Sequence, residues 1–99
     1  MGYMVNKSLL NFQASLFAEG IKTQIKEGIP DCYEYAITFD GADQPGSFLL
    51  GKINNNILVL HHRTGMESYD IKFKESILTL AYNPKFIQQL KHTLSKYQK

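Results

Sequence analysis

Two adjacent histidines followed by an arginine are the residues of this chain whose types could do chemistry. His61, His62 and Arg63 come directly after the apolar run at 57–60. Imidazole rings bind metals and transfer protons near neutral pH. Neighbouring residues of a strand point to opposite faces, so the two rings are not predicted to share a metal ion. The roles of His61 and His62 stay open between histidines at a strand end and one ligand contact beside Arg63.

The remaining reactive residue types do not form a catalytic pattern. Asp40 and Asp43 lie in a segment rich in turn formers, which explains both carboxylates without a calcium loop. Cys32 follows Asp31, and a neighbouring acid raises the pKa of a thiol and does not activate it. The glycines match neither the P-loop nor the dinucleotide fingerprint. We therefore expect a protein that is not an enzyme, with no cofactor and no metal site.

Lysines of the C-terminal segment are the candidates for contact with a polyanion. Lys85, Lys96 and Lys99 fall on one side of a predicted helix, opposite Phe86 and Leu90. A basic face of this kind can follow the phosphates of a nucleic acid. The chain has one arginine, although arginine dominates recognition of bases and phosphates. The alternatives are a solvated helix face, a nucleic-acid contact, or a contact with an acidic protein or a membrane surface.

The run Ile57-Leu58-Val59-Leu60 determines the predicted arrangement of the elements. Side chains alternate across a strand, so four consecutive apolar residues predict a central strand that is buried on both faces. The covers are two amphipathic helices, expected over residues 7–27 and 84–97. Asn83-Pro84 is a strong start signal for the second helix, since Asn caps and Pro suits the first helical position. The predicted strands cover residues 33–39, 47–53, 56–62, 67–74 and 77–82.

The first predicted helix has an apolar stripe that is wider than one sheet face can cover. A large exposed apolar patch usually marks a contact with another molecule. We therefore expect a protein partner or a second copy of the chain, forming a homodimer. The residues predicted for this interface are Leu9, Leu10, Phe12, Leu16 and Phe17.

Length and composition limit the class of protein. Ninety-nine residues make a single domain, 1–99, that can bury one core without metals or disulfides. The one cysteine excludes an internal disulfide and fits a reducing compartment. No segment has the pattern of a signal peptide or the apolar length of a membrane span. A cytoplasmic protein without a membrane partner is expected.

In its layout, one helix followed by five short strands resembles the Sm-like small barrels, which bind RNA as rings. Phe48-Leu49-Leu50-Gly51-Lys52-Ile53, the asparagine turn and the run 57–60 look like the second and third strands of such a barrel. The resemblance implies a closed sheet and an RNA ligand. The chain departs from that family in its long loop at 41–47. It also has no recognisable RNA-pocket motif after the fourth strand.

The sequence thus predicts an α+β fold, with an antiparallel meander of four to five strands and a helix at each end. The alternative is a small closed β-barrel of Sm-like layout with terminal helices. The expected function is a small non-enzymatic protein-binding or regulatory module that self-associates. The alternative is a small nucleic-acid-binding protein that uses its basic C-terminal helix.

Overall fold

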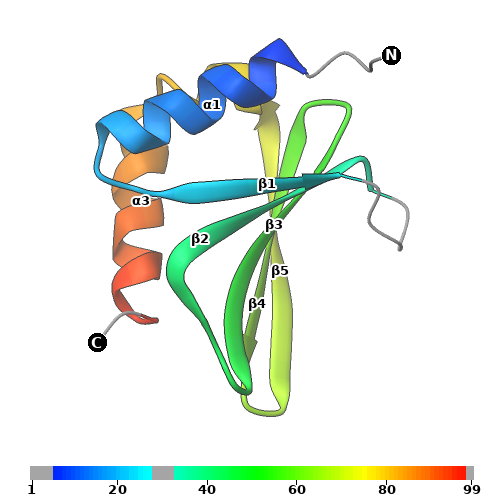
Figure 1. Cartoon of the computed structure of the whole chain (residues 1–99), viewed down its shortest axis with the longest axis vertical. Coiled ribbons are helices and arrows are strands. Elements are labelled where there is room, and N and C mark those ends of the chain that lie inside the picture. Colours follow the sequence, from blue (N-terminus) through cyan, green and yellow to red (C-terminus); the bar gives the residue numbers. More distant parts are fainter. Residues whose placement is uncertain (1–5, 28–32, 98–99) are drawn as a thin grey trace.

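The computed structural model describes residues 6–27 and 33–97, which form an α+β fold built on one antiparallel sheet (Figure 1). The strand order is β1-β2-β3-β4-β5, so each strand pairs with its neighbour along the chain. β1 and β5 do not pair among the described residues, and the sheet is open. The open meander confirms the predicted fold class, and the alternative of a closed barrel is wrong. The elements are α1 (Lys7–Ala18), β1 (Thr23–Glu27), β2 (Tyr35–Gln44), β3 (Ser47–Asn54), β4 (Ile57–Thr64), β5 (Glu67–Ser76), α2 (Ile77–Leu80) and α3 (Pro84–Ser95).

Helix α1 ends nine residues earlier than the predicted helix 7–27. Gly20 adopts a φ of 85°, and its N–H donates to the carbonyl of Phe17 while the Ile21 N–H donates to that of Leu16. This pattern is a Schellman motif, in which glycine takes the left-handed position after the helix. The segment after Gly20 then becomes strand β1, so the prediction of helix for residues 23–27 was wrong.

A tight turn sets the register of the central hairpin. Asn55 and Asn56 both have positive φ, 51° and 64°, as a type I′ turn between β3 and β4 requires. The carbonyl of Asn56 accepts from the Ile77 N–H at 2.7 Å, and its side chain accepts from Asn6 at 2.7 Å. The predicted asparagine hairpin is confirmed, and the turn also holds the first residue of α2 and the N-cap of α1.

Strand β2 continues through the segment that was predicted to be a loop. Its regular pairing with β3 is interrupted between Thr38 and Asp43, where the register shifts, and resumes up to Gln44. Gly51 lies in a regular part of β3, paired with Ile37 and Leu60. A Cβ on Gly51 would collide with the side chain of Ile37. Glycine at position 51 therefore gives the covering side chains room and does not bend the strand.

Residues 77–82 form no strand, which corrects the fifth strand of the prediction. Ile77, Leu80 and Ala81 are buried, and their spacing of three and four residues is that of a helix. Leu78, which shares strand parity with Leu80, is half-exposed instead. The helical turn α2 thus inserts three apolar side chains into the core, and the last paired strand is β5.

Helix α3 begins as predicted from Asn83-Pro84. The Asn83 side chain accepts from the backbone N–H groups of Lys85 and Phe86, at 3.0 and 3.4 Å. The ring of Phe86 packs against Phe12 of α1 at 5.9 Å between centroids and edge-on against Phe73 of β5 at 5.1 Å. α1, α3 and the sheet therefore share one core.

The helices all cover the same face of the sheet, called the covered face below (Figure 1). Leu58 and Leu60 of β4 point into that core and are fully buried. Ile57 and Val59 point to the other side, called the open face, where Ile57 is 37% exposed and Val59 is half-buried. The run 57–60 does lie in an inner strand, but the prediction of a cover on each side was wrong. No described helix covers the open face.

Candidate interaction surfaces

His62 lies on the covered face, where it helps to hold the end of α3. Its side chain is 3% exposed, and its Nδ1 lies 2.9 Å from the Tyr97 hydroxyl. The ring of Tyr69, the partner of His62 on β5, stacks on the imidazole at 4.6 Å with an angle of 5°. Gln44 donates to the backbone carbonyl of Tyr97 at 2.8 Å. These contacts explain His62 as a structural histidine.

The surroundings of His62 favour its neutral form. Burial lowers the pKa of His62, and the positive charge of Lys96 and the neighbouring His61 lower it further, while Asp70 opposes them. Burial also raises the pKa of Tyr97, with a smaller contribution from Tyr69. The Nε2 of His62 is buried and has no hydrogen-bond partner among the described residues. Protonation of His62 would place an unpaired charge under α3.

His61 points to the open face and forms a pair with Asp70. Its Nδ1 lies 2.5 Å from the Asp70 carboxylate, and its ring lies 5.6 Å from that of Phe48. The hydrogen bond from His61 lowers the pKa of Asp70, and Lys52 and Lys72 also lower it, against partial burial. The residues paired with His61 on the adjacent strands are Leu50 and Asp70. The pair therefore has no hydroxyl or thiol directly opposite it for nucleophilic chemistry.

Three lysines of the open face lie in one row across the sheet, called the lysine row below. The register aligns Lys26 of β1 with Ala36, Lys52 of β3, Val59 and Lys72 of β5. Strands lie about 4.8 Å apart, so lysines on alternate strands are spaced by about 10 Å. Ala36 and Val59 lie between the lysines and form the apolar surface beneath their side chains.

A shallow hollow lies along one part of this row. The Lys52 ammonium lies 5.5 Å from the centre of the Tyr33 ring, close enough for a cation–π contact. Ile57 and Val59 contribute apolar surface to the hollow, and Asp70 and Lys72 border it. The sequence could not reveal this group, because its members come from different strands and meet only through the register.

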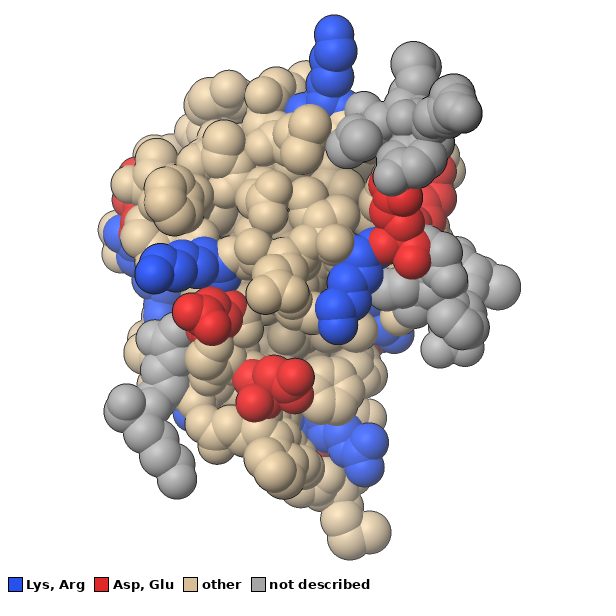
Figure 2. Space-filling view, in the orientation of Figure 1, with Lys and Arg blue, Asp and Glu red and all other residues tan. Residues whose placement is uncertain are grey.

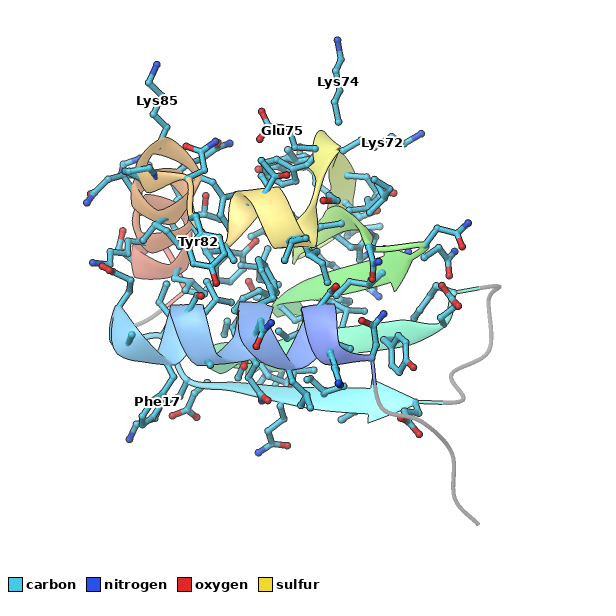
Figure 3. All side chains as sticks on the ribbon, turned by 90° about the horizontal axis from the view of Figure 1, so that it is seen from above. Phe17, Lys72, Lys74, Glu75, Tyr82 and Lys85 are labelled. Carbon is cyan, nitrogen blue, oxygen red and sulfur yellow. The ribbon has the colours of Figure 1, made fainter. Side chains whose placement is uncertain are left out.

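The predicted interface of α1 divides between the core and the surface. Leu9, Phe12 and Leu16 are fully buried, so their assignment to an exposed interface was wrong. Their helical spacing places all three on the one side of α1 that faces the sheet. Leu10 and Phe17 are 45% and 66% exposed. Figure 3 shows Phe17 projecting from α1 on the side away from Tyr82.

The lysines that were predicted to contact a polyanion on α3 are widely spaced. Lys85 and Lys96 are exposed and eleven residues apart, which is about 16 Å along the helix. Lys85 points away from the body of the protein in Figure 3. Lys91 is engaged by Glu19, 3.1 Å away. Lys99 and Cys32 lie outside the described residues.

Charges of both signs alternate on the side of the molecule seen in Figure 2, where neither sign forms a large continuous area. Within residues 6–27 and 33–97, no group of three or more metal-ligating side chains comes together. The described helices are too short or too polar to cross a membrane.

We compared the chain with protein-family models, with curated proteins and with solved structures, and none of the three comparisons gave a match.

Proposed function

We propose that this protein is a small, non-enzymatic protein-binding module that self-associates as a homodimer through α1. The observation that carries the proposal is the pair Leu10 and Phe17, both exposed and seven residues apart on one flank of the helix. Residues with this spacing lie along the same line of a helix. An aromatic and a leucine side chain in contact with water gain by association with apolar surface.

The charge of α1 supports a second copy as the partner. Its twelve residues include one charged side chain, Lys7, so two copies of the helix can approach without like-charge repulsion. In an antiparallel pair, Phe17 of one copy lies opposite Leu10 of the other, and this contact forms twice. A reducing, cytoplasmic location, which the single cysteine favours, belongs to the proposal.

Sedimentation equilibrium across the micromolar range tests the proposal. The wild-type protein is expected to form a dimer, and the double variant Leu10→Ser/Phe17→Ser is expected to weaken dimerisation at least about tenfold, because each serine removes the apolar contact. Tyr82→Ser is the matched control, since Tyr82 is 71% exposed but lies away from Phe17 (Figure 3). A wild-type monomer at all of these concentrations would refute self-association. Equal weakening by Tyr82→Ser would refute the assignment to the flank of α1 that carries Leu10 and Phe17.

A nucleic-acid-binding protein is the second candidate function. Lys85 and Lys96 give it little support, because Gln89 and His92 lie between them on the same side of α3. The lysine row of the open face gives it more.

A further inference from the structure

The open face carries more positive than negative charge. In the paired part of the sheet, Lys26, Lys52, Lys72 and Arg63 point to this face, against the carboxylates of Asp43 and Asp70. The hydrogen bond from His61 and the charges of Lys52 and Lys72 lower the pKa of Asp70, so this carboxylate offsets part of the positive charge of the row. The face therefore has cationic groups left over for a negatively charged ligand.

Rings lie beside these cations on the same face. Tyr33 lies under the Lys52 ammonium, and Phe48 lies beside His61, all of them half-buried. A ring held by its neighbours offers a flat surface for a nucleic-acid base, and stacking of this kind tolerates any base sequence. Cations and rings on the uncovered face of a sheet are the combination with which proteins bind single-stranded nucleic acid.

We propose that the open face binds single-stranded nucleic acid, with the strand lying across β1 to β5. The lysine row contacts phosphates, and Tyr33 and Phe48 stack on bases. A second copy of the chain fits this face poorly, because two lysine rows would repel each other. An acidic polypeptide would match the charge but would leave the rings without a planar partner. The inference concerns a face other than the α1 flank, so it stands or falls independently of self-association.

Fluorescence anisotropy with a labelled oligouridylate of about 20 nucleotides, long enough for the site sizes of single-strand binders, tests the proposal. We expect binding at low salt, with log K falling against log salt at a slope of roughly −2, because three phosphates contribute about −0.7 each. The double variant Lys52→Glu/Lys72→Glu should weaken binding at least about tenfold and flatten that slope. Circular dichroism would verify that the variant is folded.

The matched control is Lys85→Glu/Lys96→Glu, which makes the same charge change on α3. It is expected to weaken binding by less than about threefold, through the long-range field alone. Equal loss in both double variants would overturn the assignment to the sheet. Absence of any anisotropy change for the wild-type protein at low salt would overturn nucleic-acid binding altogether.

Poly-glutamate distinguishes an acidic protein from a nucleic acid. Tyr33→Ala should weaken oligouridylate binding about five- to tenfold, since stacking on one ring contributes about that much per base. The same variant should leave any binding of poly-glutamate unchanged. If poly-glutamate binds as tightly as oligouridylate and Tyr33→Ala affects neither, the face is a docking surface for acidic protein and the proposal fails.

Discussion

His61 and His62 are neighbours in the chain, yet they lie on opposite faces of the sheet and in different surroundings. His62 is buried under α3 against Tyr69 and Tyr97, whereas His61 meets Asp70 at the surface. Three helical elements shield the covered face from water, whereas no described helix shields the open face. The same side-chain type therefore packs under a helix on one face and pairs with a carboxylate on the other.

The largest expected effect is the difference in unfolding free energy between a substitution at Leu58, on the covered face, and one at Val59, on the open face. Leu58→Ala should lower the free energy of unfolding by about 2–5 kcal/mol, because it leaves a cavity among fully buried side chains. Val59→Ala, on the open face, should cost about 1 kcal/mol, since a half-buried valine loses less apolar burial. Urea unfolding measures both values. Equal costs would mean that the open face is covered in solution.

The pH dependence of stability should come from the covered histidine. Burial lowers the pKa of His62 in the folded state, so the unfolded chain binds a proton there more readily than the folded one. The contribution of His62 is therefore present above the pKa of an unfolded histidine and is lost as the pH falls below it toward the folded value. Urea unfolding at pH 7.5 and at pH 5.5 should show the wild-type protein less stable at the lower pH.

Two variants assign this dependence to one ring. His62→Phe keeps a planar ring against Tyr69 but removes the proton-binding group, so it should lose less stability between the two pH values than the wild-type protein does. His61→Asn removes the open-face imidazole and should keep most of the wild-type dependence. A flat wild-type profile, or a dependence that disappears with His61→Asn, would contradict the structural role of His62.

The smallest expected effect concerns the open-face carboxylate. Asp70→Asn should cost less than about 1 kcal/mol at neutral pH, as expected for a partly exposed pair. The pKa of Asp70 is lowered in the folded state, so this contribution is present above the unfolded pKa and is lost as the pH falls through the folded value. Acid titration of the unfolding free energy of both proteins should show their difference shrinking at low pH. A difference that grows toward acid pH would contradict this pairing.

Local signals in the sequence predicted most of the elements. Asn83-Pro84 fixed the start of α3, and Asn55-Asn56 predicted the central hairpin. In the predicted strand 67–74, the alternate residues Tyr69, Ile71 and Phe73 share the covered face as strand geometry requires, although Tyr69 remains half-exposed there. These signals succeed because capping and turn chemistry act within a few residues.

The errors arose where a local pattern allowed two structures. Gly20 is the signal that ends α1, but the apolar residues beyond it continued the helical spacing as far as Ile25. Ile77-Leu78-Thr79-Leu80 suits a strand by composition, and only packing against α1 selects a helix. The lysine row had no signal within one segment, because it depends on how three strands align. Long-range register is the part of the fold that this sequence did not disclose.

The turn at Asn55-Asn56 has a consequence for protein engineering. Exposed turns usually accept inserted tags and new chain ends, and the Gly65-Met66 turn, where Met66 is fully exposed, fits that rule. Asn56, by contrast, fastens α2 through its carbonyl and α1 through its side chain. Lengthening that turn would break the hydrogen bonds by which Asn56 holds both helices. A reporter should therefore be inserted at Met66 and not between β3 and β4.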